Sequence, residues 1–408
     1  MTYCLVFNAL IGLFLSGLGS MQIGGEEGIG LFSRNGSGGG KLVAASGCFL
    51  SIFIAMNKGP QAFSVGTRVL ITGASGMVGQ ALTRLLLAEG YGVVHLFRPS
   101  SLKPKVDPDQ GSLMSAELNT GAVMDQSTSS GPDSGAVTIG STPGDLHRFA
   151  WDPEQGIIDE RAWDGVSAVV HLAGAGVADA RWTPTRKREI MESRIRSTRL
   201  LSDCLFQRKA KQLQVPGCVV SASAIGYYGD AGQRLCCESD PPGTGFLSEV
   251  CQLWEAEAKP MEAATRLNIL RIGVVLSEKG GALPKMAFPM RFFAGGVLGS
   301  GNQVMSWIHL EDLGRQILHI IQNDNCRGVY NAVAPLPVSQ YLLLKALGQR
   351  LRRPLWTWIP GPALRLMLGG MADMVLHSQK VSNERIQSTS FRCRYPSITE
   401  ALQALYGG

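Results

Sequence analysis

The chain has 408 residues, with 38 Lys and Arg against 32 Asp and Glu, which gives a formal net charge of +6. This length suits two or three domains, or one doubly wound α/β domain with a cap, and a hydrophobic content of 45% is enough to form a core. No block of Lys and Arg is dense enough for a nucleic-acid footprint, so we expect no nucleic-acid partner.

The nine cysteines are scattered along the chain. They form no CxxC pair, and no Cys/His cluster has the spacing of a zinc site. We therefore predict no metal site, and reduced, mostly buried thiols in an intracellular enzyme.

Residues 1–66 differ in composition from the rest of the chain. Residues 3–18 and 42–56 are apolar, residues 33–40 between them are mainly Ser and Gly, and the whole segment holds only two acidic residues. This pattern is typical of a two-part targeting leader, so we expect residues 1–66 to be a leader or disordered, with a plastid as the first destination and the mitochondrion or cytosol as alternatives. An anchor helix or a mispredicted start codon is also compatible with it. Membrane contact is expected only through this leader, if it is retained.

The folded part begins at Thr67. Residues 68–72 (RVLIT) predict a buried parallel strand, and residues 91–97 predict the next strand. Between them apolar residues recur at helical spacing from Val78, and Gly90 supplies a stop. Strand, turn, helix and strand in this order predict one βαβ unit.

Residues 100–145 interrupt this pattern. They are rich in Ser, Gly, Thr, Pro and Asp and contain few large apolar residues. We predict a disordered insertion that carries no chemistry.

Strands and helices alternate again beyond the insertion. We expect strands at residues 168–172, 217–221 and within 267–276, and helices at residues 185–206, 248–266 and 309–322. This alternation predicts an α/β fold, a doubly wound parallel sheet (Rossmann) covered by helices on both faces. We assign residues 67–354 to an NAD(P)-binding domain and residues 355–408 to a small C-terminal helical extension.

The strongest motif is the glycine pattern TGASGMVG at residues 72–79, which follows a strand and opens a helix. Gly73 allows a tight turn, Gly76 lets the backbone approach a pyrophosphate, and Gly79 lets helix and strand pack closely. The helix N-terminus would present free N–H groups to the phosphates. The alternative is a purely structural turn. The predicted dinucleotide-binding residues are Gly73, Ala74, Ser75, Gly76, Met77, Val78 and Gly79.

The second strand is followed by Arg98, and no carboxylate stands within several residues of it. An acidic residue at this position holds the ribose 2′-hydroxyl of NAD, whereas an arginine neutralises a 2′-phosphate. Arg98 therefore predicts NADP(H) as the cofactor. An exposed arginine at the mouth of the insertion is the alternative.

The GxxGxxG spacing resembles that of extended short-chain dehydrogenases/reductases. Four further motifs resemble an atypical branch of that family, the NAD-dependent epimerase/dehydratase-like proteins with a C-terminal helical domain of unknown function. These motifs are SASAIGYYG at residues 221–229, GGAL at 280–283, MSWIH at 305–309 and FRCRYP at 391–396. The resemblance covers the chain from about Arg68 to Leu405, apart from the insertion.

Residues 171–176 (HLAGAG) look like the family's Asn-Ala-Gly turn beside the nicotinamide ribose. The resemblance therefore implies that Leu172, Ala173 and Gly174 contact the cofactor. It also implies a Ser that orients the substrate oxygen, a Tyr that transfers the proton, and a Lys that lowers the pKa of the Tyr and holds the ribose. Of these three residues only the Ser has a counterpart, Ser223. Aligning Glu255 with the family's usual acidic residue puts Leu247 at the Tyr position and Cys251 at the Lys position, and neither residue can do that chemistry.

A substitute acid or base is needed if the protein is an enzyme. Tyr227 and Tyr228 follow Ser223 at the carboxyl end of a strand, where open α/β sheets bind ligands, and they are the first candidates. Cys251 near a helix N-terminus and Lys259 are weaker candidates, and the absence of any proton-transfer residue stays open. Packed aromatics beside the cofactor are the alternative for both tyrosines.

Four other polar or aromatic residues are further candidates for the site. Trp307 and His309 either line a substrate pocket or, in the preferred interpretation, are packed where a strand meets a helix. Arg194 and Arg196 are expected on a solvated helix face.

Two functions are compatible with these observations. The first is an NADP-dependent oxidoreductase or isomerase that transfers a hydride to or from a small polar, sugar-like substrate. The second is a catalytically inactive NADP-binding protein with a structural or regulatory role, in an organelle. The expected partners are the dinucleotide and a small-molecule substrate, and the sequence leaves the oligomeric state open.

Overall fold

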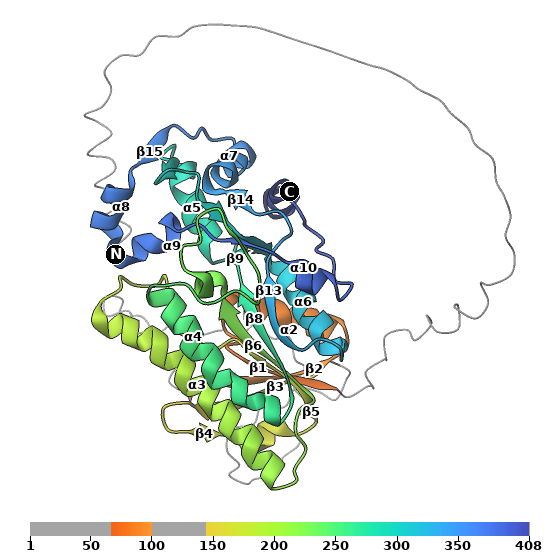
Figure 1. Ribbon diagram of the computed structural model, residues 1–408. Helices are drawn as coiled ribbons and strands as arrows, with labels where there is room; N and C mark the ends of the chain where they lie inside the picture. Colours follow the sequence, from red (N-terminus) through yellow and green to blue (C-terminus); the bar gives the residue numbers. More distant parts are fainter. Residues whose placement is uncertain (1–66, 100–143, 408) are drawn as a thin grey trace, which may run out of the picture. The chain divides into compact units, whose positions relative to one another are not determined.

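The computed structural model describes residues 67–99 and 144–407, which belong to one compact unit (Figure 1). The predicted leader at residues 1–66 and all but the last two residues of the predicted insertion lie outside the described residues.

The centre of the fold is an eight-stranded sheet with the order β13-β8-β6-β5-β1-β2-β3-β4. All neighbouring strands are parallel except β4, which pairs antiparallel with β3. The predicted doubly wound parallel sheet is therefore confirmed. Its strands are β1 Arg68–Thr72, β2 Gly92–Phe97, β3 Leu146–Asp152, β4 Ile157–Ile158, β5 Val166–His171, β6 Cys218–Ala224, β8 Arg266–Ile272 and β13 Gly328–Ala332.

Alternate side chains of each strand enter different cores, because successive strand residues point to opposite faces. Val69 and Ile71 of β1 pack with α2 (Met77–Ala88) and α6 (Leu310–Gln322) on one face. Leu70 packs on the other face. Helices cover both faces, and the sheet is the middle of three layers.

The second face is covered by α3 (Pro184–Ala210) and α4 (Phe246–Ala258), which lie side by side in Figure 1. The prediction of one helix over residues 248–266 is wrong at its end. Pro260 lies in the 3-10 turn η4 (Lys259–Ala263), where its missing N–H and its ring cannot continue an α-helix. Arg266 already belongs to β8.

Strand β3 was not predicted. Its sequence, LHRFAWD, alternates weakly, and only Trp151 among its side chains is buried. The strand lies near the edge of the sheet beside the short β4, so its sequence does not carry the apolar run of a central strand.

The C-terminal helices are present, and short strands connect them to the rest of the fold. In this region β15 (Thr357–Ile359) pairs with β10 (Gly296–Leu298), and β16 (Lys380–Val381) pairs with β7 (Leu235–Cys236). Other helical elements are η2 Glu160–Trp163, η3 Ile225–Tyr228, α5 Ala282–Arg291, α7 Gln340–Leu351, α8 Gly361–Leu368, η5 Gly369–Ala372, α9 Asp373–Leu376, α10 Glu384–Gln387 and α11 Ile398–Tyr406. The remaining strands are β9 Val274–Leu276, β11 Val304–Met305, β12 Trp307–His309 and β14 Val338–Ser339.

The FRCRYP segment anchors the C-terminal region on α6. The backbone N–H groups of Arg394 and Tyr395 donate to the two carboxylate oxygens of Asp312, at 2.7 and 2.9 Å. The Arg394 guanidinium and the Tyr395 hydroxyl donate to Glu311 at 2.7 and 3.0 Å. Upstream, the Ser378 N–H donates to the Asp230 carboxylate at 2.9 Å, directly after η3. The C-terminal region is therefore tied to the central domain at two separated places.

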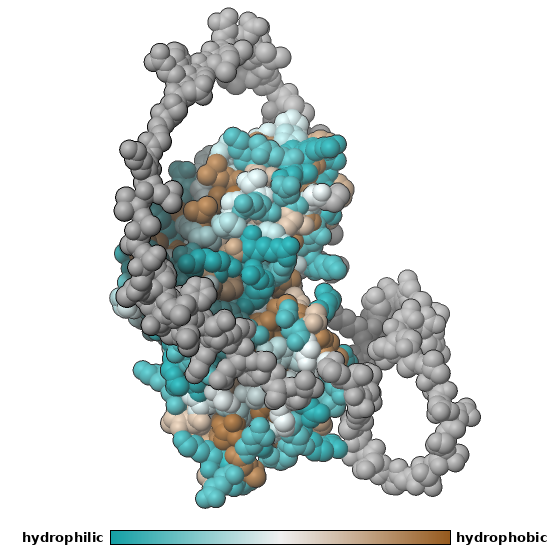
Figure 2. Space-filling model, turned by 90° about the vertical axis from the view of Figure 1, so that its right-hand side faces the viewer, coloured by the Kyte–Doolittle hydropathy of each residue, from teal (hydrophilic) through white to brown (hydrophobic). Residues whose placement is uncertain are grey.

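Figure 2 shows one face of the molecule, where hydrophilic residues predominate and apolar residues gather in small patches. Among residues 67–99 and 144–407, none of the helices is both long and apolar enough to cross a bilayer.

Candidate functional site

The carboxyl ends of β1 and β5 form the topological switch point of the sheet. From β1 the chain continues to β2 on one side, and it later returns to place β5 on the other side of β1. Open α/β sheets bind ligands in the crevice beyond such strand ends. The predicted glycine turn follows β1 at this point, and the predicted ribose turn follows β5.

Gly73 and Gly79 are required by close backbone packing. Gly73 has a φ of +70°, and a Cβ on it would lie 2.8 Å from the carbonyl carbon of Leu172. A Cβ on Gly79 would lie 2.5 Å from the carbonyl oxygen of Gly73. Gly73 therefore serves two purposes, because it both turns the chain and lets the turn touch the segment after β5.

Gly76 differs from the other two glycines because it is exposed and has space in front of it. A Cβ there would meet only the Gly73 carbonyl oxygen, at 3.3 Å. Gly76 is also the N-cap of α2, without a side-chain capping hydrogen bond and without an acidic residue in the first turn. The first hydrogen bond of the helix is donated by Gln80 N–H to the Gly76 carbonyl, at 2.9 Å. The N–H groups at the start of α2 can therefore bind an anion, and the turn fits a dinucleotide pyrophosphate.

The neighbours of these glycines differ in how exposed they are. Ala74 is buried under the turn, whereas Ser75 is exposed at its tip and Val78 is half-buried. The Met77 sulfur lies near the GGAL segment, 3.3 Å from where a Cβ on Gly280 would be. Arg98, which is partly buried, directly follows β2.

The turn after β5 is held by Thr72 and His171. The Thr72 hydroxyl oxygen accepts the N–H groups of Leu172 and Ala173, each at 3.2 Å, so its proton points to His171 Nδ1 at 2.7 Å. His171 Nε2 then donates to the Thr198 hydroxyl at 2.9 Å. Burial lowers the pKa of His171 to about 3, which keeps the imidazole neutral. The N–H groups of Leu172 and Ala173 are therefore committed to Thr72.

The loop beyond Gly174 is fixed by side chains from three directions. Four successive backbone carbonyls each accept one hydrogen bond. The pairs are Ala175 with Arg194 at 3.0 Å, Gly176 with Arg186 at 2.5 Å, Val177 with Trp182 at 2.8 Å and Ala178 with Lys285 at 3.0 Å. The expectation of a solvated helix face is met by Arg196, which is exposed, and it is wrong for Arg194, which is partly buried under this loop.

Ser223 lies near the carboxyl end of β6 and is buried. Its hydroxyl donates to Glu255 Oε1 at 2.7 Å. The same carboxylate accepts Arg271 Nε and Nη2, both at 2.9 Å, and this Glu255–Arg271 pair is largely buried. Because the proton of Ser223 is used in this bond, its oxygen can act only as an acceptor, and the Cys251 thiol is already one of its hydrogen-bond neighbours.

Tyr227 and Tyr228 lie together in η3, against Arg271. The Tyr228 hydroxyl donates to Asn331 Oδ1 at 2.7 Å and accepts Arg271 Nη1 at 3.1 Å. Burial raises the pKa of Tyr228 to about 12, so this phenol keeps its proton at neutral pH. The Arg271 guanidinium lies 3.4 Å from the centre of the Tyr227 ring, which is only half-buried.

The structure thus brings together Ser223, Tyr227 and Tyr228, and it adds two residues that the sequence interpretation did not assign to the site. Glu255 was used only to align α4, and Arg271 was not singled out. The available signal was an arginine inside the apolar run LNILRIGV, because a charge in a buried strand requires a partner.

Leu247 and Cys251 face η3 from α4. A Cβ on Gly226 would lie 3.2 Å from Leu247 Cβ and 3.7 Å from Cys251 Sγ. Burial raises the pKa of Cys251 to about 11, so the residue is a neutral thiol and the idea of a partial thiolate is wrong. Lys259 is exposed in η4 and lies outside this cluster.

Trp307 and His309 are packed residues of β12, as preferred from the sequence. Both side chains are buried. Trp307 Nε1 donates to the Leu336 carbonyl at 3.1 Å, and His309 Nδ1 accepts the Glu311 N–H at 3.2 Å as the N-cap of α6.

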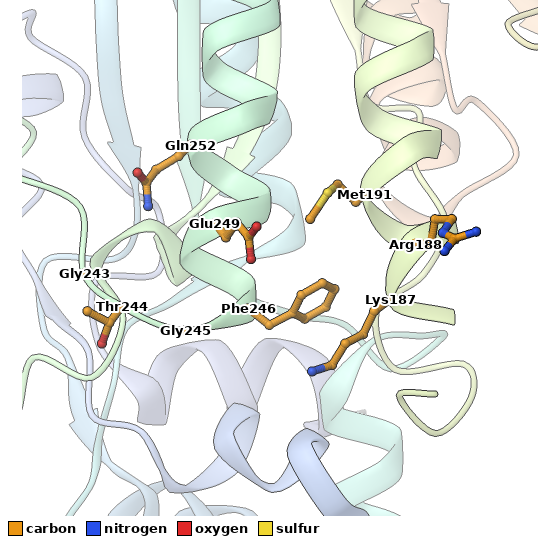
Figure 3. A pocket seen from close by; sticks show the side chains of 9 residues that line it. All are labelled: Lys187, Arg188, Met191, Gly243, Thr244, Gly245, Phe246, Glu249 and Gln252. Atoms are coloured by element: carbon orange, nitrogen blue, oxygen red, sulfur yellow. The ribbon is translucent and has the colours of Figure 1, made fainter. Parts of the chain in front are cut away.

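A pocket of about 720 Å³ opens where α3 and α4 begin (Figure 3). Lys187 points toward the Phe246 ring, 5.0 Å from its centre, and Glu249 lies on the next turn of α4. Phe246 directly precedes Leu247, so the pocket adjoins the turn of α4 that faces η3. It offers positive, negative and aromatic groups to a polar molecule.

Comparisons with known families agree with this geometry. The model of the NAD dependent epimerase/dehydratase family matches residues 69–332, and a domain of unknown function matches residues 359–405. In Arabidopsis thaliana, the epimerase family protein SDR39U1 homolog, chloroplastic, is 34% identical over 83% of this chain and 86% of its own length. The epimerase family protein ML0860 of Mycobacterium leprae is 31% identical over 82% of this chain and 94% of its own length.

Solved structures give the same picture. The human epimerase family protein SDR39U1 (isoform 2), crystallised with NADPH, is 28% identical with a TM-score of 0.66, and the match covers 84% of this chain and 99% of that one. A nucleoside-diphosphate sugar epimerase from Corynebacterium glutamicum is 29% identical with a TM-score of 0.58, over 83% of this chain and 58% of that one.

Proposed function

Since the chain belongs to the NAD dependent epimerase/dehydratase family, we propose that it binds NADP(H) and acts as an oxidoreductase or isomerase on a small polar, sugar-like substrate. The observation that carries this proposal is the glycine turn at the switch point, with its open Gly76 and uncapped α2. Arg98 after β2 supports NADP(H), as does the human relative crystallised with NADPH.

In this proposal the start of α2 binds the pyrophosphate, Arg98 binds the 2′-phosphate, and the turn at residues 172–174 lies beside the nicotinamide ribose. The cofactor, when bound, would supply a hydride acceptor or donor. Ser223 orients a substrate hydroxyl by accepting its hydrogen bond, since its own proton is directed to Glu255. Tyr227 is the better candidate for proton transfer, because the Tyr228 hydroxyl already donates to Asn331.

A catalytically inactive NADP-binding protein is the second candidate. It is favoured by Leu247 and Cys251, which occupy the expected Tyr and Lys positions and have neither a phenol nor an ammonium group.

Hydride exchange separates the two candidates. We would incubate the protein with NADPH labelled at the transferable hydrogen and a panel of carbonyl compounds, including nucleotide sugars, and follow the label by mass spectrometry. Transfer to any compound, lost in Ser223→Ala, supports the enzyme. NADPH binding without transfer supports the inactive protein, and no NADPH binding contradicts both.

We further propose that residues 1–66 direct the protein to an organelle, with a plastid first. The Arabidopsis relative is chloroplastic, which supports this destination. If the first 50 to 66 residues are removed, mass spectrometry of the protein isolated from its own cells would show a start within residues 51–67. An intact Met1 would contradict a cleaved leader.

A further inference from the structure

Arg194 lies directly beneath the turn that follows β5. Its Nη1 donates to the Ala175 carbonyl at 3.0 Å and to the Ile190 carbonyl at 2.8 Å. A Cβ on Gly174 would lie only 3.1 Å from Arg194 Cζ. The guanidinium is thus in contact with the turn that the proposed function places beside the nicotinamide ribose.

The same guanidinium lies against α4. Its carbon is 5.0 Å from the centre of the Trp254 ring, and Trp254 is one helical turn after Cys251. Burial raises the pKa of the Cys251 thiol, and the positive charge of Arg194 acts in the opposite direction. Arg194 therefore reaches, from α3, the region where Cys251 occupies the expected Lys position.

Arg194 has no acidic partner among residues 67–99 and 144–407. The buried Arg271 differs, because its ion pair with Glu255 is complete. Both hydrogen bonds of Arg194 start from Nη1, so the N–H donors of Nε and Nη2 have no hydrogen-bond acceptor among residues 67–99 and 144–407. A partly buried arginine with two adjacent unused donors is suited to two neighbouring acceptor oxygens.

We propose that Arg194 supplies from α3 the cation that Cys251 cannot supply from α4, and that it binds the hydroxyl groups of the nicotinamide ribose of NADP(H). This inference rests on the proposed cofactor binding. It adds Arg194 to the proposed cofactor-binding residues, which so far are the glycine turn, Arg98 and residues 172–174. The ligand chemistry is a vicinal diol, whose two oxygens accept from one guanidinium edge.

The test compares two ligands by isothermal titration calorimetry. NADPH contains the nicotinamide ribose, whereas adenosine 2′,5′-bisphosphate contains only the adenosine half and the 2′-phosphate. For Arg194→Met we expect NADPH to bind about ten- to hundredfold more weakly, since hydrogen bonds to a charged group are lost. Binding of adenosine 2′,5′-bisphosphate should change less than about twofold. Arg196→Met, on the same helix and exposed, should leave both affinities unchanged.

A second test moves the positively charged side chain from α3 to α4. In the double variant Arg194→Asn/Cys251→Lys the cation returns to α4, and we expect NADPH affinity to recover to within about threefold of wild type, with Arg194→Asn alone remaining weak. Cys251→Lys alone should lower the melting temperature, because two cations would face each other.

The outcomes separate the role of Arg194 from the proposed binding of NADP(H) itself. Equal weakening of both ligands, or unchanged NADPH binding in Arg194→Met, would overturn the role of Arg194. If Arg194→Met does not fold, Arg194→Lys replaces it, because lysine keeps the positive charge. The role of Arg194 would also be overturned if Arg194→Lys did not bind NADPH more tightly than adenosine 2′,5′-bisphosphate. If the wild type binds neither ligand, the proposed cofactor is wrong, which is a different result.

Discussion

Two polar clusters lie near the carboxyl ends of the central strands, and they differ in how completely they are paired. The cluster around Arg271 is closed, because Ser223, Glu255, Tyr228 and Asn331 satisfy one another through short hydrogen bonds. The cluster around Arg194 and the start of α2 is open, because donors there lack protein partners within the described residues. A closed cluster is suited to fixing positions, whereas an open one is suited to binding a ligand.

This difference separates two kinds of experiment. Changes in the open cluster should alter ligand affinity and leave the free energy of unfolding nearly unchanged. Changes in the closed cluster should alter that free energy, and they should alter chemistry through geometry except at Ser223, whose oxygen is proposed to contact the substrate directly. The predictions below use this contrast, from the largest expected effect to the smallest.

Gly76→Asp should abolish NADPH binding, with a loss of at least a thousandfold, or about 4 kcal/mol. The new side chain enters the space in front of the turn, where its carboxylate repels phosphate and accepts hydrogen bonds from the free N–H groups of α2 that a phosphate would need. Calorimetry measures the affinity, and circular dichroism with Ser75→Ala as control checks the fold. Normal affinity in this variant would mean that the turn is only structural.

Arg271→Met should lower the free energy of unfolding by about 3–5 kcal/mol, because the Glu255 carboxylate stays behind in a largely buried site without its partner. Urea denaturation measures this change. The double variant Arg271→Met/Glu255→Gln should recover much of the loss. A small effect of the single variant would show that the cluster is less closed than its hydrogen bonds indicate.

Arg98→Ala should weaken NADPH binding by about 1–3 kcal/mol and leave NADH binding almost unchanged, since only NADPH carries the 2′-phosphate. Fluorescence titration of both nucleotides measures this difference. Equal affinity of the wild type for NADPH and NADH would contradict the assignment of Arg98.

Ser223→Ala should lower kcat by one to two orders of magnitude for any substrate found by hydride exchange, which corresponds to about 1.4–2.7 kcal/mol. Cys251→Ala should change kcat little, because that thiol is neutral and buried. Tyr227→Phe and Tyr228→Phe then show which phenol transfers the proton, and we expect the larger loss for Tyr227→Phe. Loss of activity in Cys251→Ala, with normal activity in Ser223→Ala, would require a thiol mechanism.

The buried His171 should make the free energy of unfolding depend on pH. Its pKa is about 3 in the folded protein and 6.5 in an unfolded chain, so below pH 6.5 the unfolded state binds a proton that the folded state does not. Stability is complete above about pH 6.5 and falls between pH 6.5 and 3. Between pH 7 and 5.5 this residue should remove about 1 kcal/mol. In His171→Gln the loss over this interval should shrink by that amount, and an unchanged loss would contradict the neutral imidazole.

The parts of the fold that the sequence predicts well are those specified locally. The strand–turn–helix at residues 68–88 follows from glycine positions and apolar spacing within one short segment. The parallel sheet follows from repeated alternation of such segments. By contrast, the sequence does not indicate β3, because a strand near the edge of the sheet needs few buried residues, and the helix predicted from residue 248 ends early because Pro260 cannot continue it.

The candidate site was predicted only in part for a related reason. Gly73, Gly76 and Gly79 lie within one motif, whereas Ser223, Glu255, Arg271 and Asn331 come from four separate elements. Their pairing depends on the register between β6, β8 and β13, which no short pattern contains. Arg194 was placed on a solvated face because its burial depends on the neighbouring loop and on α4.

The hydrogen bonds between the C-terminal region and the central domain mean that the two parts are not independent folding units. Sequence models divide the chain between residues 332 and 359, yet Asp230 and Asp312 on one side of this division bind backbone N–H groups on the other. Removing the C-terminal part would take these backbone donors away from both carboxylates and would also take β16 from its place beside β7. The two parts should therefore unfold in one thermal transition. A chimera with a relative should fold only if both parts come from the same protein, and truncation at the boundary between the two family models should destabilise the fold.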